Sequence, residues 1–82
     1  MSDVRLSQLK IGDRAVITRF SSENSILRRL QEMGLYPGTS IRIIKYAPFG
    51  DPLEIKIRGF HLSLRLALAD NIYVTKQSES DE

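Results

Sequence analysis

The sequence contains no cysteine, no tryptophan and a single histidine, His61. Without cysteine the chain can form neither a disulfide nor a thiolate metal site. Zinc and ferrous sites normally need three or four converging ligands, and one histidine among scattered carboxylates provides no pair from which to build one. We therefore expect no metal ligand and no cofactor in this chain.

Long apolar runs are also missing. No stretch approaches the roughly 20 apolar residues that a membrane-spanning helix needs, and residues 1–13 lack the apolar centre of a signal peptide. Together with the absence of cysteine, this predicts a cytoplasmic protein that is not itself inserted into a membrane.

Sequence signals for catalysis are equally sparse. The five glycines are scattered and form neither a phosphate-binding loop of the Gly-x-x-x-x-Gly-Lys type nor a Gly-x-Gly-x-x-Gly fingerprint. A serine or threonine nucleophile would need a neighbouring base, and His61 is the only conventional one. The sequence therefore predicts a protein that is not an enzyme.

The size and the charge distribution indicate one domain with a polar end. The chain has 82 residues, 12 basic and 10 acidic, for a net charge of +2. Residues 77–82 hold Glu79, Asp81 and Glu82 and no base, so the remainder carries 12 basic and 10 − 3 = 7 acidic residues, or +5. We predict a single domain over residues 1–76 and a disordered acidic tail over residues 77–82.

A short helix with both ends specified is predicted within residues 22–35. Ile26, Leu27, Leu30 and Met33 recur at the spacing of one helical face, which we expect to be buried. Either Ser22 or Asn24 can cap the first turn.

The end of this helix carries a clear stop signal. Gly34 can adopt the left-handed conformation of a Schellman motif, which would bring Leu35 back against Leu30. The next four residues, Tyr36-Pro37-Gly38-Thr39, fit a type II turn, because proline fixes φ at the second position and glycine permits positive φ at the third.

The rest of the chain is predicted to be mainly β. Leu6 and Leu9 indicate a helical turn before a tight turn at Gly12, and residues 67–71 indicate another helical turn. The expected strands cover residues 15–20, 40–47, 53–58, 60–66 and 72–75. Within the second strand the apolar positions change parity at Ile44, which predicts a bulge or burial on both faces. About five short strands with tight connections can close into a small barrel.

A single core should join the helix to these strands. We predict that it contains Leu30, Leu35, Ile43, Ile55, Ile57 and Leu64.

An ordered set of motifs runs through nearly the whole chain. It consists of Leu6-x-x-Leu9-x-x-Gly12-Asp13, Arg29-Leu30-x-x-Met33-Gly34-Leu35-x-Pro37-Gly38, Pro48-x-Gly50-Asp51-Pro52, Leu64-Arg65, Ala69 and Ile72-x-Val74. Each piece is common by itself, but the set at these spacings resembles the ferrous iron transport protein A (FeoA) family. The structural motif residues implied by this resemblance are Gly12, Leu30, Met33, Gly34, Leu35, Pro37, Gly38 and Gly50.

The resemblance implies an SH3-like barrel with an inserted α-helix, in a family associated with transition metal ions. It also implies a cytoplasmic accessory or regulatory protein of ferrous iron uptake whose partner is FeoB, a membrane GTPase and ferrous iron permease that could recruit it to the inner membrane. The same module resembles the C-terminal domain of iron- and manganese-dependent repressors. There it follows a winged helix and a dimerisation domain, neither of which is present here. The free-standing module is therefore favoured, and a domain associated with a metal-dependent regulator or with nucleic acid is the alternative.

Basic residues on neighbouring predicted strands bear on that alternative. Arg42, Lys45, Lys56 and Arg58 could contact phosphates, but binding of single strands usually adds aromatic stacking platforms, and the core will take several of the six aromatic residues. We interpret these cations as the solvated outer face of a sheet and do not expect nucleic acid as a partner.

The partner surface is predicted at the loop from Tyr46 to Pro52, with a flank from Arg58 to His61, because recognition is commonly carried by loops on a rigid scaffold. The candidate residues are Tyr46, Phe49, Asp51, Arg58, Phe60 and His61. Phe49 could be an exposed interface anchor or a lid folded over the barrel, and the sequence leaves both possibilities open. It also leaves the oligomeric state open.

Overall fold

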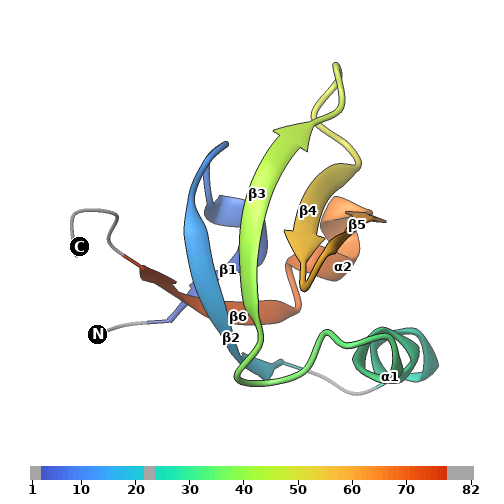
Figure 1. Cartoon of the computed structure of the whole chain (residues 1–82). Helices are drawn as coiled ribbons and strands as arrows, with labels where there is room; N and C mark the ends of the chain where they lie inside the picture. Colours follow the sequence, from blue (N-terminus) through green and yellow to red (C-terminus); the bar gives the residue numbers. More distant parts are fainter. Residues whose placement is uncertain (1–2, 22–23, 78–82) are drawn as a thin grey trace.

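The computed structural model describes residues 3–21 and 24–77, which form a curved antiparallel sheet with three short helical segments (Figure 1). The elements are β1 (Val4–Arg5), the 3₁₀ turn η1 (Leu6–Gln8), β2 (Arg14–Phe20), α1 (Ser25–Glu32), β3 (Ser40–Tyr46), β4 (Leu53–Ile57), β5 (Phe60–Leu64), α2 (Leu66–Ala69) and β6 (Ile72–Gln77). The mainly β prediction is confirmed. The predicted count of about five strands omits β1, which at two residues is too short to show any periodicity.

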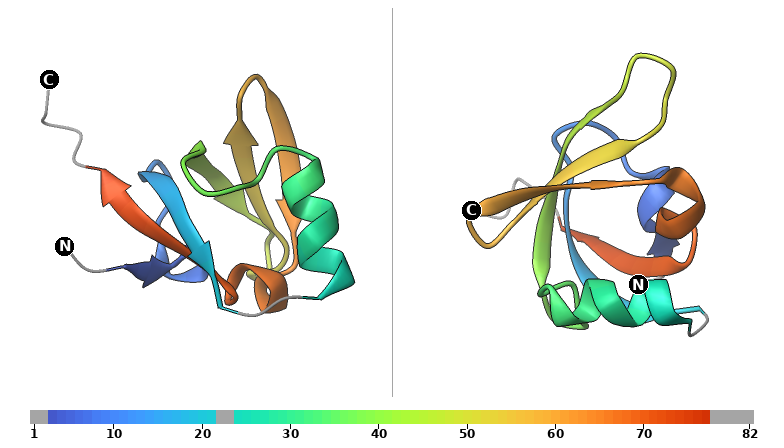
Figure 2. Two further views of the ribbon diagram at one scale, coloured as in Figure 1. Left: turned by 90° about the horizontal axis from the view of Figure 1, so that it is seen from below. Right: turned by 90° about the vertical axis from the view of Figure 1, so that its right-hand side faces the viewer.

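The six strands lie in the order β1-β6-β2-β3-β4-β5, with every neighbouring pair antiparallel. The sheet bends round on itself (Figure 2). Within residues 3–21 and 24–77 its two edge strands, β1 and β5, are not paired with each other, so the predicted barrel is not closed by backbone hydrogen bonds. Segments η1 and α2 contact each other, and the hydroxyl of Ser7 donates to Asp70 just after α2.

A bulge in β3 explains the change of parity in the sequence. Ile43 pairs with Ile55 on β4, but Lys45 pairs with Glu54, so the register shifts by one residue between them. Ile44 is the extra residue and is half-buried. The bulge allows both Ile43 and Tyr46 to pack toward the core, which confirms the predicted irregularity.

One hydrophobic cluster fills the inside of the curved sheet. All six residues predicted for the core are buried there, which confirms that prediction. The cluster also contains Leu6 and Leu9 from the N-terminal turn and Leu27 from α1, so each helical segment before β3 contributes to the same core.

Helix α1 begins and ends at the predicted signals. The side chain of Asn24 accepts a hydrogen bond from the backbone N–H of Leu27 at 2.9 Å, so Asn24 is the cap; Ser22 lies outside the described residues. At the other end Gly34 has φ of +113°, and Leu35 N–H donates to Leu30 C=O at 3.0 Å. This is the hydrogen bond of a Schellman motif, as predicted.

The buried face of α1 is narrower than the sequence pattern predicts. Leu27 and Leu30 are buried, but Ile26 and Met33 are 53% and 43% exposed. At about 100° per residue, Ile26 and Met33 lie about 100–120° around the helix from Leu27. They therefore sit at the boundary of the packed face rather than in it.

The turn after α1 fastens the helix to the sheet. Thr39 N–H donates to Tyr36 C=O at 3.0 Å and Gly38 has φ of +96°, as a type II turn requires. Gly38 N–H donates to Ile17 C=O, and Ile17 N–H donates in turn to Thr39 C=O, at 2.8 and 2.9 Å. The turn is thereby joined to β2.

The ends of several elements differ slightly from prediction. Strand β5 ends at Leu64, because Leu66 begins α2, and β6 continues through Gln77, which pairs with Arg14. Gln77 therefore belongs to the sheet, and the rest of the predicted disordered tail lies outside the described residues. Strands β1 and β6 are neighbours, with Val4 opposite Val74, so the two terminal strands of the domain lie side by side (Figure 1).

No helix in the described part of the chain is long and apolar enough to cross a membrane.

Candidate functional site

The residues predicted for the partner surface lie at the two opposite ends of the β3–β4–β5 ladder. Tyr46 pairs with Leu53 at the end where residues 47–52 connect β3 to β4, whereas Ile57 pairs with Phe60 at the other end. The five residues of β4 separate these ends by about 13 Å. The predicted loop and its flank are therefore not one continuous surface.

The loop between β3 and β4, residues 47–52, is held at its base and projects Phe49 into solvent. Ala47 N–H donates to Pro52 C=O at 3.0 Å, and Gly50 N–H donates to Ala47 C=O at 2.7 Å. Asp51 Oδ1 accepts a hydrogen bond from Leu66 N–H at 3.0 Å, which ties the loop to the start of α2. Phe49 is 98% exposed. The structure thus excludes the lid conformation for Phe49 and leaves an aromatic ring presented on a supported loop.

Tyr46 forms the inner boundary of this loop. Its ring packs against the core, and its hydroxyl donates to the backbone carbonyl of Leu9 and lies 3.4 Å from that of Ser7. Burial of the ring, with a smaller contribution from the negative charge of Asp13, raises the pKa of the Tyr46 hydroxyl above its ordinary value of 10.0. Tyr46 therefore joins the hairpin to the N-terminal turn and has little surface free for a partner.

Replacing Tyr46 with Phe should cost about 0.5–1.5 kcal/mol of unfolding free energy at neutral pH, because the hydrogen bond to Leu9 is lost. Because the pKa is higher in the folded state, the neutral hydroxyl stabilises the fold, and this contribution is fully present below the unfolded-state pKa. The contribution is lost as the pH rises through the folded-state pKa. Tyr46→Phe should therefore flatten the fall of stability above about pH 10. Urea unfolding of both proteins from pH 7 to 11 measures this, and parallel pH profiles would contradict it.

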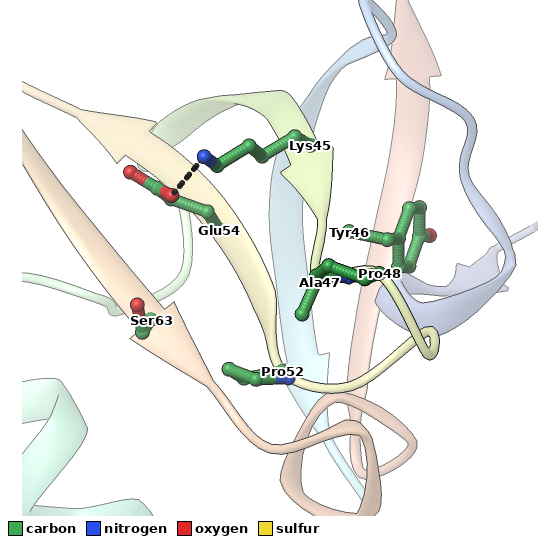
Figure 3. A pocket seen from close by; sticks show the side chains of 7 residues that line it. All are labelled: Lys45, Tyr46, Ala47, Pro48, Pro52, Glu54 and Ser63. Carbon is green, nitrogen blue, oxygen red and sulfur yellow. Dashed lines mark ion pairs between the residues drawn. The ribbon is translucent and has the colours of Figure 1, made fainter.

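A hollow of about 320 Å³ lies beside the loop, on the outer side of the hairpin (Figure 3). Its lining residues are Lys45, Tyr46, Ala47, Pro48, Pro52, Glu54 and Ser63. Glu54 Oε1 lies 4.0 Å from Lys45 Nζ, and its other oxygen lies 3.6 Å from His61 Nδ1. His61 is thus the one member of the predicted flank that contacts the lining of this hollow.

The other end of the ladder is a two-residue hairpin turn. Arg58 and Gly59 both have positive φ, +38° and +97°, as in type I′ turns. Phe60, just after the turn, is 41% exposed. Arg58 and Phe60 are accessible, but they lie at the opposite end of β4 from Phe49.

Metal-ligand geometry is absent from residues 3–21 and 24–77. No group of three His, Asp or Glu side chains there could hold an ion. His61 faces Glu54, whose carboxylate is also close to the ammonium group of Lys45. This Lys45–Glu54–His61 group could not be predicted from the sequence, because it depends on the register of three strands.

Comparisons with known proteins agree with the sequence motifs. The FeoA domain family model matches residues 4–76. A curated relative from Porphyromonas gingivalis, named as a fusion protein of Fe(2+) transport protein A and the Fe(2+) transporter FeoB, is 38% identical over 71 residues. That match covers 87% of this chain and only 8% of the relative, so most of the relative has no counterpart here.

Solved structures with the same fold include two FeoA proteins. The solution structure of FeoA from Chlorobium tepidum has a TM-score of 0.87 and 36% identity, and the match covers 95% of this chain and 74% of that one. FeoA from Stenotrophomonas maltophilia, solved with zinc and described as a prokaryotic SH3 domain protein, has a TM-score of 0.79 and 25% identity, with coverage of 94% and 99%. The predicted SH3-like fold is therefore confirmed.

The likeness to transcription regulators is a likeness of fold. A manganese-dependent transcriptional repressor has a TM-score of 0.84 but only 20% identity, and the match covers 94% of this chain and 38% of that one. The comparison shows that a transcriptional repressor contains a domain of the same fold. It is no evidence that this chain binds DNA.

Proposed function

Because its residues 4–76 match the family model, the chain belongs to the FeoA family, and we propose that it is an accessory protein that binds and regulates a FeoB-type ferrous iron transporter. The observation that carries this proposal is the P. gingivalis relative, whose name places the two proteins in one polypeptide. Domains that are joined in one polypeptide commonly act together. The proposed partner is therefore the transporter, with this chain acting from the cytoplasmic side.

The proposed role is binding rather than catalysis. The described residues bring His61 close to Glu54 and to no serine or threonine nucleophile at hydrogen-bond distance. A small, rigid sheet with projecting loops suits recognition of another protein. Regulation would then follow from a contact that changes the transporter, with no reaction carried out by this chain.

We assign the transporter contact to the loop of residues 47–52. Aromatic side chains, phenylalanine among them, are enriched at the centres of protein interfaces relative to the rest of the surface. Phe49 is an exposed side chain of this kind, and the hydrogen bonds of Asp51 and Ala47 hold its loop in place before binding. A preorganised loop loses little conformational freedom on association, which favours affinity.

Phe49→Ala should weaken association with the FeoB-type transporter at least about tenfold, since anchor side chains commonly contribute more than 1.4 kcal/mol to binding. The melting midpoint should stay unchanged, because the ring contacts almost nothing within the domain. Binding to detergent-solubilised transporter by biolayer interferometry, together with a thermal melt of each variant, makes the measurement.

Phe60→Ala is the matched control, since it removes the same ring from the opposite end of β4. Normal association in Phe60→Ala and lost association in Phe49→Ala would assign the contact to the loop. Equal losses in both would indicate a contact spread over the hairpin, and normal association in Phe49→Ala would remove the loop from the interface.

A further inference from the structure

Basic side chains form a row across the middle of the sheet. Arg14 on β2 pairs with Arg42 on β3, and Arg42 pairs with Lys56 on β4. Directly paired residues have Cα atoms about 5 Å apart and side chains on the same face. The three cations are exposed and so point outward together.

Two further residues extend this row, one on each side. Gln77 on β6 pairs with Arg14, and His61 on β5 pairs with Lys56. Ser40 lies two residues before Arg42 on β3 and so belongs to the same outer face, and Arg58, in the turn after β4, lines the same hollow. We call Arg14, Arg42, Lys56 and Arg58 the cationic row.

None of these four side chains has a carboxylate within ion-pair distance in residues 3–21 and 24–77. The ion pairs there join Arg19 to Asp3, Lys45 to Glu54 and Lys76 to Asp13. Like charges placed directly opposite one another in a sheet are unfavourable. The row therefore keeps an unfavourable arrangement that an anionic ligand would relieve.

The surface over the row is concave. A shallow hollow of about 330 Å³ is lined by Arg14, Ser40, Ile41, Arg42, Lys56, Arg58 and Gln77. Ser40 and Gln77 add neutral hydrogen-bonding groups to the four cations. Arginine presents a planar fork that binds carboxylates through two parallel hydrogen bonds. The hollow thus combines charge and geometry for several carboxylate groups at once.

We propose that the cationic row binds an acidic segment of a partner protein. This goes beyond the contact assigned to Phe49, since it concerns a different face and does not depend on the identity of the transporter. The segment would present three or four carboxylates at about the 5 Å spacing of the strands, a spacing that residues at i and i+4 of an acidic helix provide.

The surroundings of the row favour an acidic segment over an extended polyanion. No aromatic side chain lines the hollow, so the bases of a single-stranded nucleic acid would find no stacking platform. Beside the row on β4, Glu54 lies two residues from Lys56 on the same face, with its carboxylate facing Lys45 and His61. A long polyanion that continued along β4 would therefore meet a carboxylate, whereas a short acidic segment fits within the hollow.

The test is titration of the ¹⁵N-labelled full chain with a short synthetic oligoglutamate peptide, followed by NMR. Saturable shifts are expected for the amides of Arg14, Arg42, Lys56 and Arg58, and added salt should weaken them. Arg42→Glu should lower the affinity about tenfold, since it reverses the central charge of the row. Its melting midpoint should stay equal or rise, because the new carboxylate stands between Arg14 and Lys56.

Arg28→Glu is the control, as it changes the net charge equally on the exposed side of α1. It should bind the peptide within about twofold of wild type. A single-stranded oligonucleotide and vesicles containing phosphatidylglycerol are titrated in parallel. The proposal is overturned by the absence of saturable shifts at the row, by an equal loss in Arg28→Glu, or by tighter binding of the oligonucleotide or the vesicles than of the peptide.

Discussion

Leu30→Ala is expected to destabilise the domain by about 2–5 kcal/mol, which is a large share of the stability of so small a protein. Leu30 is one of the two residues, with Leu27, through which α1 reaches the core, and its carbonyl also closes the Schellman motif with Leu35. Truncation would leave a cavity between the helix and the core cluster. Urea unfolding curves should show a lower midpoint with an unchanged slope.

Met33→Ala provides the matched comparison on the same helix. Met33 is 43% exposed, and alanine is a good helix former, so we expect a loss below about 1 kcal/mol. A loss below about 0.5 kcal/mol for Leu30→Ala would mean that α1 contributes little to the cooperative fold. A large loss for Met33→Ala would mean that the helix packs through a wider face than the structure describes.

Gly34→Val is the second substitution with a large expected effect, a loss of about 2–3 kcal/mol of unfolding free energy. Gly34 has φ of +113°, a conformation that a β-branched residue adopts only with strain. The two hydrogen bonds that end the helix, from Gly34 N–H to Gln31 C=O and from Leu35 N–H to Leu30 C=O, depend on this conformation. In the valine variant either these hydrogen bonds are broken or the backbone is strained at residue 34. Both results would lower the midpoint of thermal unfolding.

Gly50→Ala is the comparison for the helix stop. Gly50 also has positive φ, +93°, so alanine is not free of strain there, and a loss of about 1 kcal/mol is expected. The loop of residues 47–52 can adjust without disturbing the core, whereas Gly34 lies between a buried helix and a turn hydrogen-bonded to β2. Equal midpoints for the two variants would refute the importance of the helix stop.

Local features of the fold could be predicted because each depends on a few consecutive residues. The stop at Gly34 and the turn at Gly38 are of this kind and are present, and of the two predicted cap candidates, Ser22 and Asn24, Asn24 accepts the capping hydrogen bond. The alternation in residues 53–57 likewise gives β4 and its buried face. The parity change at Ile44 even indicates the bulge, because a period of two makes a one-residue insertion visible.

Features that depend on which strands are neighbours could not be predicted in the same way. The sequence groups Lys45 with Arg42, Lys56 and Arg58, but the bulge brings Lys45 opposite Glu54. Arg14 lies just before the predicted first strand, and only its pairing with Arg42 reveals it as part of the cationic row. The periodicity of a strand predicts which face of the sheet a side chain lies on. Its neighbours on that face depend on the register between strands that are distant in sequence.

The same limit explains why the residues predicted for the partner surface are divided between two places. Phe49 and Phe60 are close in sequence, with Phe49 in the loop between β3 and β4 and Phe60 at the start of β5, just after the β4–β5 turn. Because strand β4 lies between them, the two residues are nevertheless at opposite ends of the sheet. Proximity in sequence therefore predicts one surface, whereas the antiparallel strand order places the residues on two separate parts of the molecule.

The pairing of β1 with β6 has a consequence for how the domain can be tethered. Val4 and Val74 are opposite one another, whereas the loop of residues 47–52 projects in another direction (Figure 1). A linker attached before β1 or after β6 would leave the domain from the same side, and the ring of Phe49 would remain accessible. Covalent attachment replaces a weak bimolecular encounter with a high effective concentration, about millimolar for a short flexible linker. A contact too weak to survive dilution would then suffice in a fused protein, whereas a free-standing domain would have to rely on the affinity of the contact proposed for this loop.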